Sequence, residues 1–225
     1  MRYHVAVVSL ALAASTLGAQ TAPNFQGVVH FNVESNGTGT ELLYMIRGAK
    51  VRTEMSMHGA RIVMLTDVAA GETMIVDEQH KVYRVFSAAD APDAPPPTFT
   101  RLGTKDHVAG HECEYFRIRS EDGINADICA ASGLGLFVGS RDMAWAPNSG
   151  AMRALAAKSP DFARVMLEGF LPLKVKSAMP DGSRPTTMTA TNIEVKAVDA
   201  SLVTLPAGYT KIEMPTMSGR GPGRP

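Results

Sequence analysis

Residues 25–67 read FQGVVHFNVESNGTGTELLYMIRGAKVRTEMSMHGARIVMLTD, and this stretch decides the fold class. Within 25–33, apolar and polar side chains alternate, and only Val28 interrupts the pattern. A period of two indicates a β-strand with one buried face. Asn36-Gly37 then forms a turn, because both residue types tolerate positive φ. The stretch therefore predicts several antiparallel strands in succession.

The same pattern of short apolar segments and turns continues through most of the chain. The spacing of the turn residues is typical of an antiparallel meander. The later predicted strands cover 73–77, 81–87, 99–110, 171–179, 186–198 and 202–206, and the predicted helices cover 149–158 and 159–169. This order predicts a mainly β (α+β) fold, a curved antiparallel sheet or half-barrel whose concave face is covered by two short helices.

The N-terminus has the layout of a secretory signal peptide over residues 1–19. Arg2 supplies a positive charge, an uncharged apolar run follows, and small residues lead to Ala19, where we expect cleavage. A membrane anchor that is retained is the alternative. We expect a single half-barrel domain over 20–215, a disordered tail over 216–225, and a periplasmic or extracellular location.

The charge balance argues against two classes of partner. The chain has 22 Lys and Arg residues and 22 Asp and Glu residues, so its formal net charge is zero. Nucleic acids and anionic membrane surfaces both require clustered cations. We therefore expect no nucleic-acid binding and, at most, a peripheral association with the cell envelope. The oligomeric state does not follow from the sequence.

Both cysteines of the chain lie in HECEYFRIRSEDGINADIC, residues 111–129, which has two interpretations. The midpoint between Cys113 and Cys129 is residue 121, inside a turn, so a hairpin would place the two thiols nearly opposite each other. In an oxidising compartment such a pair forms a disulfide, which stabilises the fold by about 3 kcal/mol. The alternative is a reactive Cys113 thiolate with His111 as its base.

Few residues suggest catalysis or metal binding. The chain contains no G-x-S-x-G, H-E-x-x-H, phosphate-binding loop or dinucleotide-binding motif. The candidate metal ligands form two sets: His107, His111 and Cys113, and Met55, Met57 and His58. Core packing on an alternating strand also explains Met55 and Met57. We therefore expect a protein without a metal or other cofactor, and one that is not an enzyme.

Methionine is the unusual feature of the composition, with 13 residues. Because its side chain is flexible, Met suits a surface that accepts variable apolar shapes, although it also fills cores. Segments such as LLYMI (42–46) and IVMLT (62–66) are apolar on both faces, which a one-sided sheet does not need. A second layer of protein or a bound ligand would explain them. The predicted lining residues of a ligand cavity are Phe31, Val33, Tyr44, Met55, Met57, Met64, Phe162 and Met166.

Several segments resemble a known family. FQGVVHFNV, the stretch GTKDHVAGHECEYF (103–116) and the ending Pro206-Ala207-Gly208-Tyr209 resemble the exported family of unknown function numbered forty-four twelve. The resemblance covers roughly Phe25 to Pro215. It implies similarity to the periplasmic lipoprotein carriers, whose fold is a half-barrel closed by helices. It implies no catalytic residues, and it suggests lipid or lipoprotein binding by analogy only.

Together these features lead to two functional expectations. The first is an exported protein that binds an apolar ligand, such as a lipid, an acyl chain or a lipoprotein, in the half-barrel cavity. The alternative is a non-enzymatic scaffold or interaction module of the cell envelope, whose sheet edge recruits a strand of a partner protein.

Overall fold

A computed structural model describes residues 25–57, 59–87, 97–120, 125–137 and 155–213. The strands are β1 (Gln26–Ser35), β2 (Thr38–Arg47), β3 (Lys50–Met57), β4 (Ala60–Asp67), β5 (Glu72–Asp77), β6 (Val82–Ser87), β7 (Thr98–Val108), β8 (His111–Arg119), β9 (Asn125–Ala131), β10 (Leu171–Ala178), β11 (Thr186–Val195) and β12 (Thr210–Lys211). The helices are α2 (Pro160–Leu167) and the short 3-10 helix η2 (Ala200–Val203).

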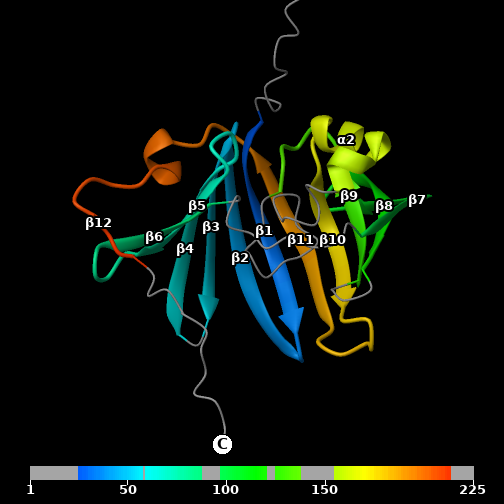
Figure 1. The fold of residues 1–225 in the computed structure, drawn as a ribbon, viewed down its shortest axis with the longest axis horizontal. Coiled ribbons are helices and arrows are strands. Elements are labelled where there is room, and N and C mark those ends of the chain that lie inside the picture. The colour runs from blue at the N-terminus through cyan, green and yellow to red at the C-terminus, as the bar shows by residue number, and fades with distance from the viewer. Residues whose placement is uncertain (1–24, 58, 88–96, 121–124, 138–154, 214–225) are drawn as a thin grey trace, which may run out of the picture.

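All strands belong to one curved, open sheet (Figure 1). The order in the 12-stranded sheet is β12-β6-β5-β4-β3-β2-β1-β11-β10-β9-β8-β7. Two runs of neighbouring antiparallel strands in sequence order, β6 to β1 and β11 to β7, meet where β1 pairs with β11, and the connection that contains α2 joins β9 to β10. Neighbouring strands are antiparallel, except that β12 runs parallel to β6. The predicted fold class, a curved antiparallel sheet with short helices, is confirmed.

The first turn shows why the sequence forms a meander. Asn36 and Gly37 have φ angles of 50° and 78°, and they connect Ser35 directly to its partner Thr38. Positive φ at both central positions matches the right-handed twist of the two flanking strands. The Asn-Gly pair therefore sets the register of β1 against β2, which in turn decides which side chains share a face.

The inner face of the sheet, defined here as the face that carries Phe31 and Tyr44, holds the main core. Both rings are fully buried. The ring of Tyr44 stacks on Phe137 with 5.1 Å between centroids, and its hydroxyl donates to the carbonyl oxygen of Leu136 at 3.1 Å. The segment that follows β9 thus packs onto the centre of the sheet and fills it with aromatic rings.

Helix α2 covers the inner face near the β7 end (Figure 1). Its Phe162 is 1% exposed and packs edge-on against Phe99 of β7 with a centroid distance of 4.8 Å. The helix begins at the predicted position, where Ser159 Oγ accepts a hydrogen bond from the backbone nitrogen of Phe162. Of the predicted helix over 149–158, the described part, residues 155–158, is helical.

A second layer lies on the outer face, the opposite face of the sheet, which carries Val28. This residue broke the alternation of β1, and it packs against Val198 and Val203 of the C-terminal segment. Further along the sheet, Val63 and Leu65 belong to another buried cluster. Partly buried Leu205 and Tyr209 of the C-terminal segment pack against that cluster. The C-terminal segment explains why LLYMI and IVMLT are apolar on both faces.

One predicted strand is wrong. Residues 202–206 were expected to be extended, but η2 occupies Ala200–Val203. Asp199 causes the difference, because its carboxylate accepts from the backbone nitrogen of Ser201 at 2.8 Å and so favours a tight turn over a strand. The predicted signal peptide, residues 1–19, and the predicted tail, residues 216–225, lie outside the described residues. Within the described ranges, no helix is long and apolar enough to span a membrane.

Candidate functional site

The two cysteines form the predicted disulfide between β8 and β9. Their Cα atoms are 5.3 Å apart, and Cys113 and Cys129 are 2% and 0% exposed. The register differs by two residues from the prediction, because Cys129 lies directly opposite Tyr115 and not Cys113, which moves the hairpin midpoint from residue 121 to residue 122. The disulfide is therefore diagonal. Neither cysteine has a free thiol, so this structure does not contain the alternative nucleophile.

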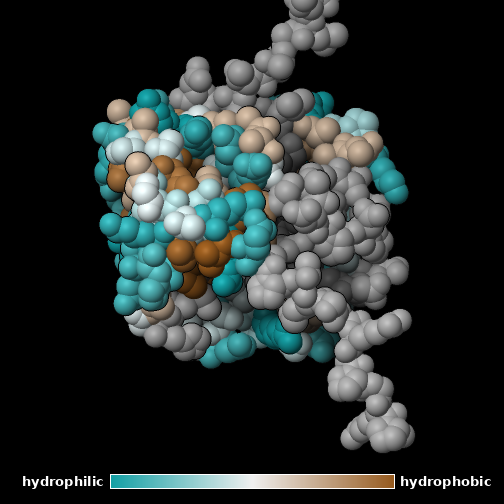
Figure 2. All heavy atoms as spheres, turned by 60° about the vertical axis from the view of Figure 1, so that its left-hand side comes forward, coloured by the Kyte–Doolittle hydropathy of each residue, from teal (hydrophilic) through white to brown (hydrophobic). Residues whose placement is uncertain are grey.

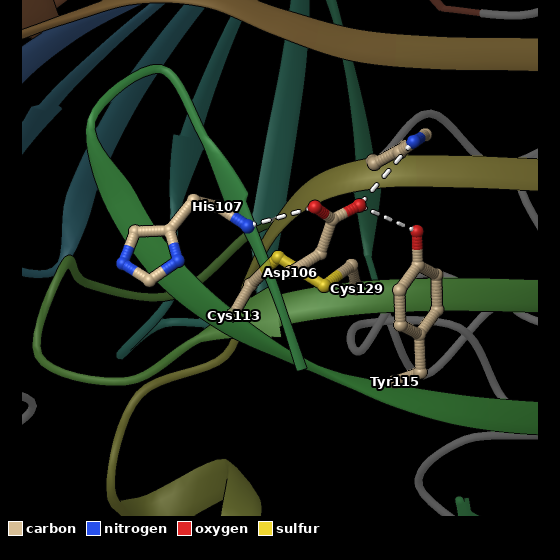
Figure 3. The surroundings of a disulfide bond; sticks show 6 residues. Asp106, His107, Cys113, Tyr115 and Cys129 are labelled. Carbon is tan, nitrogen blue, oxygen red and sulfur yellow. Dashed lines mark hydrogen bonds and ion pairs between the residues drawn. A yellow bond between two sulfur atoms is a disulfide. The ribbon is translucent and has the colours of Figure 1, made fainter. Parts of the chain in front are cut away.

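A polar cluster lies beside the disulfide (Figure 3). The Oδ2 atom of Asp106 accepts hydrogen bonds from the Tyr115 hydroxyl at 3.0 Å and from Lys174 Nζ at 3.4 Å. The backbone nitrogen of His107 donates to the other carboxylate oxygen at 2.8 Å. These bonds, the one from His107 first, hold the pKa of Asp106 below its ordinary value. The three side chains thus satisfy one another beside the buried disulfide.

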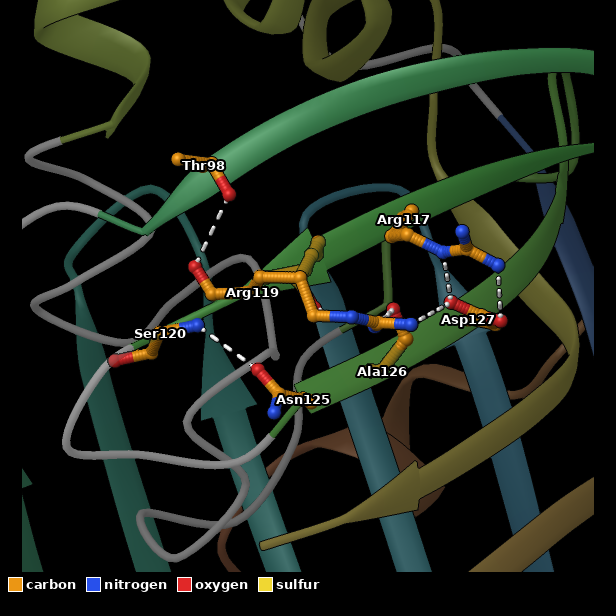
Figure 4. A network of polar contacts seen from close by, with 8 residues as sticks. Thr98, Arg117, Arg119, Ser120, Asn125, Ala126 and Asp127 are labelled. Carbon is orange, nitrogen blue, oxygen red and sulfur yellow. Dashed lines mark hydrogen bonds and ion pairs between the residues drawn. The ribbon is translucent and has the colours of Figure 1, made fainter. Parts of the chain in front are cut away.

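A second polar network stabilises the other end of the same hairpin (Figure 4). The Asp127 carboxylate receives two hydrogen bonds from Arg117, at 2.9 and 3.0 Å, and one from Arg119 at 2.8 Å. Arg119 also donates to the carbonyl oxygens of Ile118 and Ala126. Because every charge in this network has a partner, it stabilises the hairpin and offers no free group to a ligand.

The candidate metal ligands do not gather into a site. Cys113 is bonded to Cys129 in the disulfide, and Met55 is half-buried against the main core. The side chain of Met57 and residue His58 lie outside the described part of the structure. Within the described part, no group of three or more His, Cys, Asp or Glu side chains has the arrangement of a metal site.

The predicted lining residues whose side chains the structure describes divide into three groups. Phe31 and Tyr44 share the inner face at the centre, but they are 0% exposed and pack against the protein's own Phe137. Phe162 lies at the β7 end, where its ring partners include Phe99 and Phe170. The half-buried or nearly buried members on the inner face are Val33, Met55 and Met64. The side chains of Met57 and Met166 lie outside the described residues. Their role as a ligand lining stays a prediction.

A groove of about 540 Å³ lies at the ends of β4, β5 and β6, beside the residue that follows β12. Figure 2, in which this edge of the sheet faces the reader, shows apolar side chains in patches surrounded by hydrophilic ones. The residues that line the groove are Gly59, Ala60, Arg61, Ile62, Ile75, Val76, Asp77, Glu78, Gln79, Val82, Tyr83, Arg84 and Ile212. Ile75 is 38% exposed, an unusual state for a large apolar side chain in the middle of a strand.

The groove borders the inner face of the sheet through Ile62 and Ile75, whereas Val76 and Tyr83 belong to the outer-face cluster. Ile75 lies directly opposite Met64, and Ile62 lies directly opposite Met55, so these two groove residues each pair with one of the predicted lining residues. Side chains that face each other in this way have Cβ atoms about 5 Å apart. The sequence prediction therefore identified the neighbours of the groove but missed Ile62 and Ile75 themselves, although both lie in predicted strands.

An ion-pair network forms one side of the groove. Arg52 is nearly buried, and its guanidinium contacts Glu54 and, at 2.8 Å, Glu78. Arg61 contacts the same two carboxylates, at 2.6 Å for Glu54 and 3.2 Å for Glu78. Burial alone would raise the pKa of Glu54, but the hydrogen bonds from both arginines outweigh it and lower that pKa. Glu54 is therefore ionised, and both carboxylates on this side are paired with arginine side chains.

A smaller hollow of about 210 Å³ lies between β8 and the end of α2. Both of its cations are paired: Arg101 makes two contacts of 2.6 Å with Glu114, and Lys105 contacts Glu112 at 2.6 Å, whereas Glu168 makes no ion pair within the described residues. Because the two cations that would recognise an anionic ligand already have partners, we assign the hollow no binding role.

Three solved structures illustrate what the chain is similar to. An uncharacterised conserved protein from Thermus thermophilus has 9% identity and a TM-score of 0.49, covering 84% of this chain and 90% of that one. MucB in the MucA/MucB complex of Pseudomonas aeruginosa has 16% identity, a TM-score of 0.42, and coverages of 81% and 56%. A domain described as an outer membrane lipoprotein-sorting protein, from Vibrio parahaemolyticus, has 7% identity, a TM-score of 0.36, and coverages of 81% and 91%.

No curated protein sequence matches the chain. A family model does match, over residues 25–209, which span every strand except β12 and include the disulfide hairpin and all groove residues but Ile212. The chain therefore belongs to the family described as "Domain of unknown function (DUF4412)".

Proposed function

We propose that this protein is an exported, non-enzymatic binding protein for an apolar ligand, and that the groove at β4–β6 receives the ligand. The ligand class is a lipid, a free acyl chain or the acyl part of a lipoprotein. The observation that carries the proposal is the exposed Ile75 in a groove of about 540 Å³. That size is typical of small-molecule sites, which have apolar walls and a few polar groups at the rim.

The groove suits an apolar ligand better than the centre of the inner face does. Phe31, Tyr44 and Phe137 already fill the centre at the packing distances of a protein core. A ligand there would have to displace these rings, whereas a ligand over Ile62 and Ile75 would only displace water. Removing exposed apolar surface from water stabilises a complex by about 25 cal/mol per Å².

Export is part of the proposal and has two supports. The first is the signal-like N-terminus, and the second is the shielded disulfide between Cys113 and Cys129, a bond that persists in oxidising compartments. Cleavage near Ala19 would be visible as the mass of the protein recovered from the periplasm or medium. A protein that keeps its first 19 residues in the membrane fraction would contradict the location.

A pair of matched variants tests the groove. Ile75→Asp places a charge on its floor, and Leu202→Asp makes the same change at a residue that is 43% exposed in η2 and lies outside the groove lining. We expect wild type and Leu202→Asp to bind a fluorescent fatty acid equally, and Ile75→Asp to bind it at least about tenfold more weakly. Ile75→Ala adds no charge and should give a smaller, severalfold loss.

The affinities can be compared only between variants that are folded to the same extent. Thermal unfolding of the three variants identifies any that are misfolded, and Ile75→Ala remains informative if Ile75→Asp is unstable. Equal binding by wild type, Ile75→Ala and Ile75→Asp would place the ligand elsewhere. No affinity of the wild type for any acyl probe would refute the proposed function, and turnover in a broad esterase and peptidase screen would refute its non-enzymatic part.

The alternative function, a scaffold whose sheet edge recruits a strand of a partner protein, has weaker support than ligand binding in the groove. Neither edge of the sheet favours such pairing. Strand β7 ends the sheet, but its register shifts between Arg101 and Lys105, and charged side chains flank the irregularity. Bulges and charges of this kind protect an edge from pairing with another strand. At the opposite edge, Thr210 and Lys211 of β12 already pair with β6.

A further inference from the structure

We infer that the groove ligand is a single-chain amphiphile with an anionic headgroup, and that Arg84 binds the headgroup. This inference rests on the proposed function, because it names the class of ligand that the same groove would take. The chemistry it predicts is a carboxylate or a phosphate ester attached to one alkyl chain.

The first argument is the state of the charges around the groove. Glu78 contacts Arg52 and Arg61, and Asp77 is bound by His80, whose ring nitrogen Nδ1 lies 2.8 Å from its Oδ2 atom. Each of these two carboxylates thus has a side-chain partner within the described residues. Among the ion pairs of the described residues, none involves Arg84. Arg84 is therefore the groove cation that is free to receive an anion from solution.

The second argument is the position of Arg84 on the sheet. It lies on β6 directly opposite Ile75 on β5, and both are on the inner face. Directly opposite residues have Cβ atoms about 5 Å apart, so the guanidinium and the exposed isoleucine border the same space. An alkyl chain that covers Ile75 and Ile62 brings its polar end within reach of Arg84.

The third argument is chemical. A guanidinium presents several N–H donors in a planar fork that matches the two oxygens of a carboxylate or phosphate. A neutral alcohol offers one oxygen without charge, and an alkylammonium is repelled. The groove should therefore discriminate between amphiphiles of identical chain length by their headgroups alone.

Calorimetric titration of the mature protein tests this with four C12 probes below their micellar concentrations: laurate, lauryl phosphate, lauryl alcohol and laurylamine. We expect laurate or lauryl phosphate to bind at least about tenfold more tightly than the alcohol, since hydrogen bonds to charged groups are the strong ones. The ratio of the two anions then identifies the preferred headgroup.

Two variants identify the residue responsible. Arg84→Gln should bind the anions only as well as the alcohol, while leaving the affinity for the alcohol unchanged. Arg164→Gln, the same substitution at an arginine that is exposed on α2, is the control for a loss of one surface charge. Arg84 is exposed, so its variant should unfold at the wild-type temperature.

The two proposals fail in different ways. Equal affinity of the wild type for all four probes, or an anion preference that Arg84→Gln retains, would refute the headgroup inference and leave the apolar groove intact. Failure of all four probes to bind the wild type would refute the apolar groove and, with it, the inference.

Discussion

Removal of the disulfide is the perturbation with the clearest magnitude. The bond joins residues separated by 16 positions, and closing a loop of that size in the unfolded chain corresponds to about 3 kcal/mol of stability. For a domain of this size, each kcal/mol shifts the melting temperature by about 2–4 °C. The double variant Cys113→Ala/Cys129→Ala should therefore melt about 6–12 °C below the wild type.

The assay is thermal unfolding followed by circular dichroism, with and without reductant. Wild type in strong reductant should approach the melting temperature of the double variant once the covered bond has been reduced, and the double variant should not respond to reductant at all. A decrease of less than about 2 °C in the double variant would refute the reasoning, because it would mean that the unfolded chain gains no freedom from losing the bond. A response of the double variant to reductant would show that the effect is not due to this bond.

Three further outcomes follow from the contacts of Phe162 and Glu54. Phe162→Ala should lower the free energy of unfolding by about 3–5 kcal/mol in a denaturant titration, because it removes a buried ring between α2 and the sheet, whereas Val165→Ala, at a half-buried position of the same helix, should cost less. Glu54→Gln should cost about 2 kcal/mol at pH 7, since Arg52 loses one of its two carboxylate partners in a nearly buried position. The folded-state pKa of Glu54 lies below its ordinary value of 4.5, so its stabilisation is complete above that pH and is lost as the pH falls through the lower pKa. The wild type should lose this contribution in acid, and Glu54→Gln should show a flatter dependence on pH.

The architecture was predictable because its signals are local. Alternation in β1 and the Asn36-Gly37 turn depend on neighbouring residues, and each was sufficient to predict a strand or a turn. Ser159 and Gly169 likewise marked the limits of the predicted helix, and α2 lies within them. The one interruption of the alternation in β1 also has a structural reason, because a second layer covers Val28.

The groove was not predictable because its parts come from distant segments. Ile62 and Ile212 are 150 positions apart in the sequence, and the strand that places Ile212 beside β6 consists of two residues only. A parallel pairing of that length leaves no periodic signal. The exposure of Ile75 is equally invisible in the sequence, because its segment TMIVD has the composition of an ordinary buried strand.

Strands with apolar residues on both faces are not evidence for a ligand, because the outer layer of the protein covers their second face. The apolar residues on both faces of β2 and β4 are accounted for by the aromatic core on one side and by Val198, Val203 and Tyr209 on the other. The same C-terminal segment that covers the outer face also supplies Ile212, whose backbone nitrogen donates to the carbonyl oxygen of Tyr83 at 2.9 Å. One segment of the chain thus both covers the outer face and completes the groove. The case for a ligand accordingly depends on Ile75 and Arg84, the two neighbours in this groove for which the protein's own chain supplies neither full apolar cover nor an ion-pair partner among the described residues.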